Sequence, residues 1–216
     1  MTKELRRLGH EAYSCDLIPC SGGYPEWHLQ VDALELLKLR WDMIIAFPPC
    51  TYLTAAGAVR LKNHDGSVKD YDRLRRGQEA ARFFRAFLEA DCPKIAIENP
   101  VPMKIFDLPP HTQRIEPYMF GDPWRKRTLL WLKGLPRLMP TNVVEPQGLW
   151  VGSTSARRDS SIKSRYKLAS IRDSKRRAKT FPGIARAMAE QWAGEEKEGA
   201  ACAEEHSGVS NYPGRA

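Results

Sequence analysis

Residues 41–50 read Trp-Asp-Met-Ile-Ile-Ala-Phe-Pro-Pro-Cys, an apolar run that ends in two prolines and a cysteine. A short continuous apolar run is typical of a strand buried on both faces of a parallel sheet. Open α/β sheets bind their ligands beyond the carboxyl ends of such strands, which is where Cys50 follows. Pro48 and Pro49 restrict the backbone there, so we expect the thiol of Cys50 to be held in place for chemistry. The alternative is a small residue buried at a strand end.

A second strand is indicated by residues 94–97, Lys-Ile-Ala-Ile, which lead into Glu98 and Asn99. Between the two strands, residues 71–90 carry apolar side chains at three- and four-residue steps, a pattern that predicts a helix with one face on the core. Strand, helix and strand make the βαβ unit of a parallel sheet. We therefore expect a thiol, Cys50, and a carboxylate, Glu98, at the same edge of one sheet, as a nucleophile and an acid/base pair.

Four motifs follow one another in a defined order along the chain. They are Pro49-Cys50, Glu98-Asn99-Pro100, Arg125-Lys126-Arg127 before an apolar run, and Phe-Pro-Gly-Ile-Ala at residues 181–185. In order and strand context they resemble the motifs of the DNA cytosine-5 methyltransferases, most closely a compact phage and prophage branch of that family. The resemblance covers about residues 5–193. It departs from the family where Pro100 replaces a valine and where the glutamine of the Gln-x-Arg-x-Arg motif is absent.

Carbon 5 of cytosine is a poor nucleophile, and the resemblance implies covalent catalysis to activate it. The thiolate of Cys50 would add to carbon 6, and Glu98 would stabilise the charge that develops at ring nitrogen 3. Arg127 would donate to the ring carbonyl oxygen, although the alternative for this arginine is a solvated turn. The loop over residues 51–70 would close over a flipped base. The other substrate- or DNA-binding residues implied in this region are Asn99, Arg125 and Lys126.

Methylation of an exocyclic amine is the other large class of base methylation, and the same turn disfavours it. Enzymes of that class carry Asp or Asn before Pro-Pro, as an acceptor for the amine proton, and an aromatic residue after it, as a stacking face. The equivalent positions here are Phe47 and Cys50. Since a phenylalanine side chain accepts no hydrogen bond, the sequence favours transfer to carbon.

The resemblance also implies S-adenosylmethionine as cofactor and a Rossmann-like methyltransferase fold, an α/β fold with a mostly parallel sheet. Asp16, at the end of a predicted strand, matches the residue that binds the ribose hydroxyls, and Asp32 matches the one that contacts the adenine amine. The alternative is a pair of ordinary solvated aspartates near turns. The family's first strand and Phe-x-Gly-x-Gly loop would precede Thr2, so we expect an N-terminally truncated fold. The other expected cofactor contacts are Phe47, Pro48 and Pro49.

The chain has 216 residues, of which 42% are hydrophobic, enough for one substantial core. We expect a catalytic core over residues 1–135, a short basic target-recognition segment over 136–179, a C-terminal helix over 180–193 that returns to the core, and a disordered tail over 194–216. The sequence has no run of about 18 apolar residues and no signal-peptide pattern, so we expect a cytoplasmic protein of a bacterial or phage-infected cell, without a membrane span. Five cysteines without paired C-x-x-C spacing favour free thiols over disulfides or a metal site. We expect a monomer.

Positive charge is concentrated in residues 157–179. This segment contains ten Lys or Arg residues and two Asp residues, an excess equal to the whole net charge of +8. Basic residues interrupted by Tyr166 and several serines are typical of a segment that contacts nucleic-acid phosphates. We therefore expect double-stranded DNA as partner, and the alternative is a basic linker without a specific role. The expected DNA-binding residues of the segment are Arg157, Arg158, Lys175, Arg176, Arg177 and Lys179.

Three functional classes fit these features. The first is a DNA cytosine-5 methyltransferase. The second is a truncated, catalytically disabled relative that binds DNA through its basic segment. The third is an enzyme that modifies a pyrimidine in a nucleotide or in RNA. The truncation favours the second class, whereas the presence of both Cys50 and Glu98 favours the first.

Replacing Lys175, Arg176, Arg177 and Lys179 with glutamine should weaken the binding of all duplexes alike, because these side chains would neutralise phosphates without reading bases. If about half of the basic residues of the segment contact phosphates, affinity falls with salt at a log-log slope of about −4 to −5, and the variant should flatten that slope by up to about 3 to 4 units. A fluorescence-anisotropy salt titration on two unrelated duplexes measures both slopes. An unchanged slope would make the segment a solvated linker.

Overall fold

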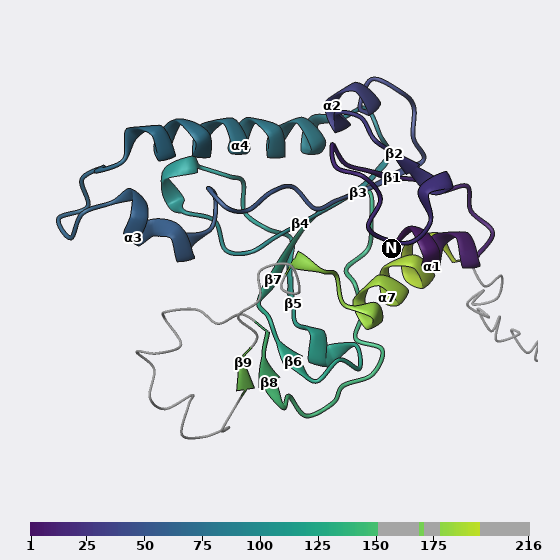
Figure 1. Ribbon diagram of the computed structural model, residues 1–216. Helices are drawn as coiled ribbons and strands as arrows, with labels where there is room; N and C mark the ends of the chain where they lie inside the picture. Colours follow the sequence, from purple (N-terminus) through teal and green to yellow (C-terminus); the bar gives the residue numbers. More distant parts are fainter. Residues whose placement is uncertain (151–168, 171–177, 195–216) are drawn as a thin grey trace, which may run out of the picture.

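The computed structural model describes residues 1–150, 169–170 and 178–194. Its central sheet contains four strands in the order β3, β4, β7, β5 (Figure 1). The strands are β3 (Met43–Ala46), β4 (Lys94–Asn99), β5 (Gln113–Ile115) and β7 (Thr128–Lys133). Of the residues expected to bind DNA, Arg157, Arg158, Lys175, Arg176 and Arg177 lie outside the described residues, and so does the expected tail from residue 195 onward.

The predicted βαβ unit is present, because β3 and β4 pair in parallel and α4 (Tyr71–Glu89) connects them. Strand β7, however, runs antiparallel to both β4 and β5. A parallel neighbour needs a crossover connection, usually a helix, and the helices between β4 and β7 are the single turns η3 (Lys104–Phe106) and η4 (Pro117–Met119). The expectation of a mostly parallel sheet is therefore wrong for the central sheet. The Rossmann-like methyltransferase fold stays a prediction.

The side chains of the sheet alternate between two cores. Ile95 and Ile97 of β4 belong to the core that includes the apolar face of α4, whereas Ala96 between them belongs to the core that includes α7 (Pro182–Ala193). Strand β7 alternates in the same way. A strand with this period of two and apolar residues on both sides must be covered on both faces. Helices α4 and α7 provide that cover from opposite sides of the sheet (Figure 1).

Helix α4 confirms the helix predicted over residues 71–90. It begins at Asp70, whose carboxylate accepts a hydrogen bond of 2.8 Å from the amide of Arg73 and so satisfies one of the unpaired amides of the first turn. Phe84 and Phe87 anchor its apolar face in the core. Helix α4 is the longest helix that the described residues form, and none of these helices has the length and apolar character needed to cross a membrane.

Helix α7 confirms the helix expected over residues 180–193. Its first turn approaches the preceding chain so closely that a Cβ added to Gly183 would lie 1.9 Å from the carbonyl oxygen of Phe120. The amide of Gly183 donates to the carboxylate of Asp122 at 3.0 Å. A glycine is therefore required at this position by close packing, and it fixes where α7 begins.

Two smaller sheets complete the described structure. Strands β1 and β2 pair in parallel, and β6, β8 and β9 form a three-stranded parallel sheet. Helix α1 packs against α7, where Arg7 and Glu190 form an ion pair of 2.8 Å. The bounds of these and the remaining elements are α1 (Thr2–Arg7), β1 (Ser14–Cys15), η1 (Pro25–Trp27), β2 (His28–Leu29), α2 (Ala33–Leu36), η2 (Ala55–Gly57), α3 (Ala58–Leu61), β6 (Trp124–Arg125), β8 (Gly148–Leu149) and β9 (Ala169–Ser170).

Candidate active site

The carboxyl ends of β3 and β4 lie together and are joined by a buried side chain. Ala46 pairs with Ile97 in the sheet, so the next residues along the two strands are neighbours. Asn99 is completely buried, and its Nδ2 donates a hydrogen bond of 3.1 Å to the carbonyl oxygen of Pro48. Because a carbonyl only accepts, this contact fixes which way the amide of Asn99 points. The side chain of Asn99 therefore ties the turn that contains Cys50 to the strand that contains Glu98.

The loops that follow the two strands are also bonded to each other. The amide of Ala55 donates to the carbonyl oxygen of Val101 at 2.8 Å, and the amide of Met103 donates to that of Leu53 at 2.7 Å. Leu53 is fully buried in the core below α4. The first part of the loop over residues 51–70, expected from the sequence to be polar and to close over a base, is thus an anchored part of the fold.

Cys50 is half-buried in a tight turn after β3. Its carbonyl oxygen accepts hydrogen bonds from the amides of Leu53, at 3.1 Å, and Thr54, at 2.9 Å. Among the described residues no disulfide is formed, and Cys15, Cys20 and Cys92 are thiols as well. The thiol of Cys50 is therefore presented by a backbone whose hydrogen bonds are already made.

Glu98 lies in a largely dry position at the end of β4, where its side chain is 19% exposed. Burial raises the pKa of this carboxyl above its usual range, and the ammonium of Lys126, 4.0 Å away, opposes this rise with a smaller effect. The cavity beside Glu98 has a volume of about 10 Å³ and is also lined by Phe47, Thr128 and Phe181. It is no larger than a single water molecule. Burial in this small cavity therefore shifts the titration of Glu98 toward the form that can donate a hydrogen bond.

The positive charge beside Glu98 belongs to Lys126, whereas the sequence predicted Arg127 at the base. Lys126 lines the cavity together with Thr128, whereas Arg127 between them is exposed and is not part of the lining. The guanidinium of Arg125 stacks over the ring of Tyr118 at 5.1 Å. Lys126 therefore lies at the cavity where Arg127 was expected, and the roles of both residues toward a base or a phosphate stay predictions. Alternation along this segment, with Thr128 buried in the strand, was the signal that could have identified Lys126.

Asp16 and Asp32 are exposed at the ends of β1 and β2, which pair in parallel. The thiol of Cys15 donates to the carbonyl oxygen of Val31 at 3.3 Å. Burial, and then the negative charges of Asp16 and Asp32, raise the pKa of Cys15, although the hydrogen bond to Val31 lowers it. Both carboxylates therefore act on one thiol, and the structure brings the two predicted aspartates together.

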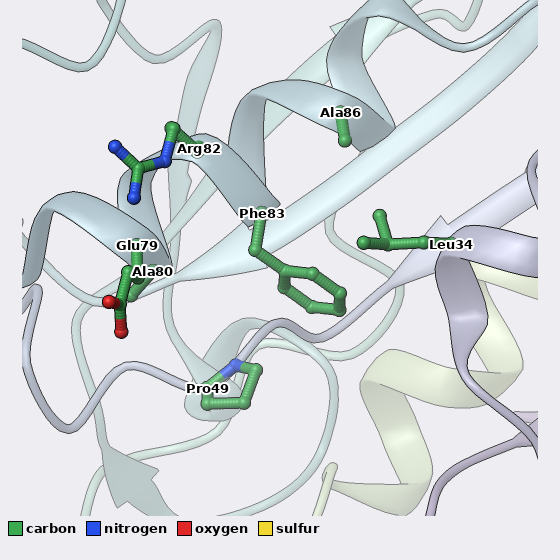
Figure 2. A pocket seen from close by; sticks show the side chains of 7 residues that line it. All are labelled: Leu34, Pro49, Glu79, Ala80, Arg82, Phe83 and Ala86. Atoms are coloured by element: carbon green, nitrogen blue, oxygen red, sulfur yellow. The ribbon is translucent and has the colours of Figure 1, made fainter. Parts of the chain in front are cut away.

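An apolar groove of about 530 Å³ lies between α2, α4 and the turn after β3. Figure 2 shows the ring of Phe83 directed from α4 toward Leu34 and Pro49. Asp32 is the N-cap of α2 and accepts a hydrogen bond of 2.9 Å from the amide of Leu34, so it stands at one side of the groove. The groove is completed by Glu79, Ala80, Arg82 and Ala86.

Of the three consecutive residues predicted to contact a cofactor, Pro49 lines this groove, whereas Phe47 lines the cavity at Glu98 and Pro48 is buried. Phe83 and Leu34 were missed by the sequence analysis, because their apolar spacing predicts only core positions. Within the described residues, no three His, Cys, Asp or Glu side chains are grouped as metal ligands.

No protein-family model, curated protein or solved structure matches this chain. The roles of its residues therefore depend on the geometry of the two cavities and on the chemistry of the groups that line them. These groups are a thiol in a turn tied to β4 by a hydrogen bond, a carboxyl whose pKa is raised by burial, and an apolar groove.

Replacing Glu98 with glutamine should make the protein more stable relative to wild type as pH rises. A raised pKa means that the folded state holds its proton where the unfolded state has lost it, so wild type loses stability above about pH 4.3, the ordinary value for glutamate. Glutamine has no proton to lose. Urea denaturation at pH 4 and pH 8 measures the difference, with Glu89→Gln on the exposed end of α4 as control. A difference that is the same at both pH values would show that folding leaves the pKa of Glu98 unchanged.

Proposed function

We propose that this chain is a DNA cytosine-5 methyltransferase, which transfers a methyl group from S-adenosylmethionine to carbon 5 of cytosine in double-stranded DNA. The observation that carries the proposal is the hydrogen bond from Asn99 to Pro48, because it holds the turn of a nucleophilic thiol against the strand end of a buried acid. The same pair of side chains on unconnected loops would carry little functional meaning.

The proposed chemistry uses both groups in one addition and elimination. The sulfur of Cys50 bonds to carbon 6, and the electron pair of the 5,6 double bond moves to carbon 5. Carbon 5 takes the methyl group, which S-adenosylmethionine supplies on a positively charged sulfur. Loss of the carbon 5 proton to solvent returns the electron pair to the double bond and expels the thiolate of Cys50. The products are methylated cytosine, the demethylated cofactor and one proton.

Glu98 and Lys126 support the addition step. A protonated Glu98 donates a hydrogen bond to ring nitrogen 3 and stabilises the negative charge that the addition pushes into the ring. Lys126, beside Glu98, supplies positive charge on the same side of the base. The cavity at Glu98 is too small for a pyrimidine, so a base reaches it only when the residues that cover it move.

The groove between α2 and α4 fits the adenosine part of the cofactor. Its lining is largely apolar, as a stacked adenine requires, and it adjoins the turn that contains Cys50. Asp32 is the N-cap of α2, whose Leu34 lines the groove, and it would accept from the adenine amine, while Asp16 would accept from the ribose hydroxyls. Both aspartates are exposed, which leaves them accessible to such a ligand.

DNA would be held mainly by the basic segment around residues 157–179, with exposed basic side chains near the site in support. Arg127 and Lys179 are both exposed. They lie close in sequence to Lys126 and Phe181, which line the cavity at Glu98. Phosphate contacts here would orient the duplex without reading its sequence.

A duplex that contains 5-fluorocytosine should trap the protein covalently, because fluorine at carbon 5 cannot leave as a cation when elimination restores the double bond. With S-adenosylmethionine present, a denaturing gel should show a shifted band for wild type. Cys50→Ala should give no band, whereas Cys20→Ala, which removes another half-exposed thiol, should behave as wild type. If wild type binds the duplex but forms no adduct, the chain is a DNA-binding protein without this chemistry.

Filling the groove should block the cofactor without removing any core contact. Ala86→Phe places a ring in the groove, and Gln78→Phe places the same ring on the exposed surface of the same helix. Calorimetry with S-adenosylmethionine should show at least about tenfold weaker binding for Ala86→Phe than for Gln78→Phe, or about 1.4 kcal/mol. Equal affinities for the two variants would place the cofactor elsewhere.

A further inference from the structure

Thr51 and Tyr52, the two residues directly after Cys50, are bound by side chains from the first turns of α4. The Nη2 of Arg73 donates a hydrogen bond of 2.8 Å to the carbonyl oxygen of Thr51, and its guanidinium lies 5.1 Å from the centre of the Tyr52 ring. Arg76 approaches the same ring, and its Nη1 donates to the hydroxyl of Tyr52 at 3.0 Å. We call these four residues the Tyr52 clasp. Both guanidinium groups lie near one aromatic ring, and each also donates one hydrogen bond to the loop. The clasp is therefore a specific contact between the loop and the helix.

The Tyr52 clasp adds a second anchor to the turn, so the backbone before Cys50 is bound to one element and the backbone after it to another. The carbonyl oxygen of Pro48 accepts from Asn99 of β4, and that of Thr51 accepts from Arg73 of α4. The carbonyl oxygen of Cys50 itself accepts from two amides of its own turn. The carbonyl groups of Pro48, Cys50 and Thr51 are therefore bound by the strand, by the turn itself and by the helix of the βαβ unit. Removal of any one of them leaves the turn free to rotate on that side.

The structure keeps a space open for Arg73. A Cβ added to Gly57 would lie 2.7 Å from Nη2 of Arg73, while its next nearest neighbour, the carbonyl oxygen of Thr51, would lie at 3.7 Å. The backbone of Gly57 has φ −89°, which any residue can adopt, so the only close contact of a Cβ there would be with the end of the Arg73 side chain. The Nε of Arg73 is buried and makes no hydrogen bond to the described residues.

From these contacts we infer that Arg73 is a positioning residue for Cys50, with Arg76 in support. Arg73 sets the direction of the Thr51 carbonyl and thereby the orientation of the peptide that carries the thiol. The inference rests on the proposed function, since it assigns the turn a catalytic thiol to orient. It concerns a residue that would touch neither the base nor the cofactor, so its effect should appear in turnover and not in binding.

Arg73→Ala should loosen the turn and slow methyl transfer together. We expect about tenfold faster hydrogen exchange at the amides of Leu53 and Thr54, and a fall in kcat of about tenfold with unchanged KM for DNA and cofactor, as for one lost charge-assisted hydrogen bond. Arg73→Lys should recover part of both, because an ammonium can still donate to Thr51. The control is Arg75→Ala, which removes an arginine that pairs with Asp72 and Glu79 on the exposed face of α4. It should change neither quantity.

Gly57→Ala tests the same contact without removing a charge. The new methyl group displaces Arg73, so the variant should reproduce the exchange and the kcat of Arg73→Ala. In the Arg73→Ala background it should have no further effect, because the group that it collides with is gone. Gly22→Ala is the matched control, since its Cβ would meet nothing closer than the sulfur of Cys20 at 4.0 Å. Circular dichroism of each variant confirms folding.

The outcomes separate this inference from the proposed function. If Arg73→Ala and Arg75→Ala behave alike in exchange and in kcat, the clasp does not position Cys50. Additive effects of Gly57→Ala and Arg73→Ala would overturn it as well. If wild type transfers no methyl group, the proposed function is wrong, and the exchange measurements alone then decide whether Arg73 holds the turn.

Discussion

The hydrogen bond between Asn99 and the carbonyl oxygen of Pro48 is the contact on which the rest of the site depends. It is completely buried, so the loss of its donor would leave a buried carbonyl unsatisfied, at a cost of about 1–3 kcal/mol. It also joins two loops that are 51 residues apart in the chain. Together with the pairing of β3 with β4 and the backbone hydrogen bonds between the following loops, it keeps the turn of Cys50 beside the end of β4.

The acidity of Glu98 is set by parts of the chain that lie far from it in sequence. Phe181, Ile184 and Met188, at and after the start of α7, complete the cavity around its carboxyl group. Helix α7 can approach this closely because Gly183 has no side chain to strike Phe120. Without that cover Glu98 would be an ordinary solvated carboxylate at a strand end. The close packing of the C-terminal helix therefore contributes to the burial that raises the pKa of Glu98.

Three consecutive residues connect the two cavities of the molecule. Phe47 lines the cavity at Glu98, Pro48 accepts the hydrogen bond of Asn99, and Pro49 lines the groove between α2 and α4. Cys50 follows directly in the chain, so the residues before it contact both cavities. The two prolines keep these directions fixed, since neither can relax by rotation about φ. The shape of the turn thus decides how the two ligands would be arranged.

Local elements, and the candidate residues at their ends, could be predicted from the sequence. The apolar run before Pro48 predicted β3, the helical spacing over residues 71–90 predicted α4, and the order of Cys50 and Glu98 on adjacent strands predicted that they share an edge. These features follow from periodicity and from the parallel βαβ connection, which act over short stretches of chain. They can be predicted without knowledge of contacts between distant segments.

Other features of the candidate site arise only when distant segments pack together. The antiparallel course of β7 is set by its pairing with β4 and β5, and the groove at Phe83 depends on the approach of α2 to α4. Each is a contact between segments far apart in the chain. Such contacts are set by packing of whole elements, and a composition or a spacing within one segment carries no record of them.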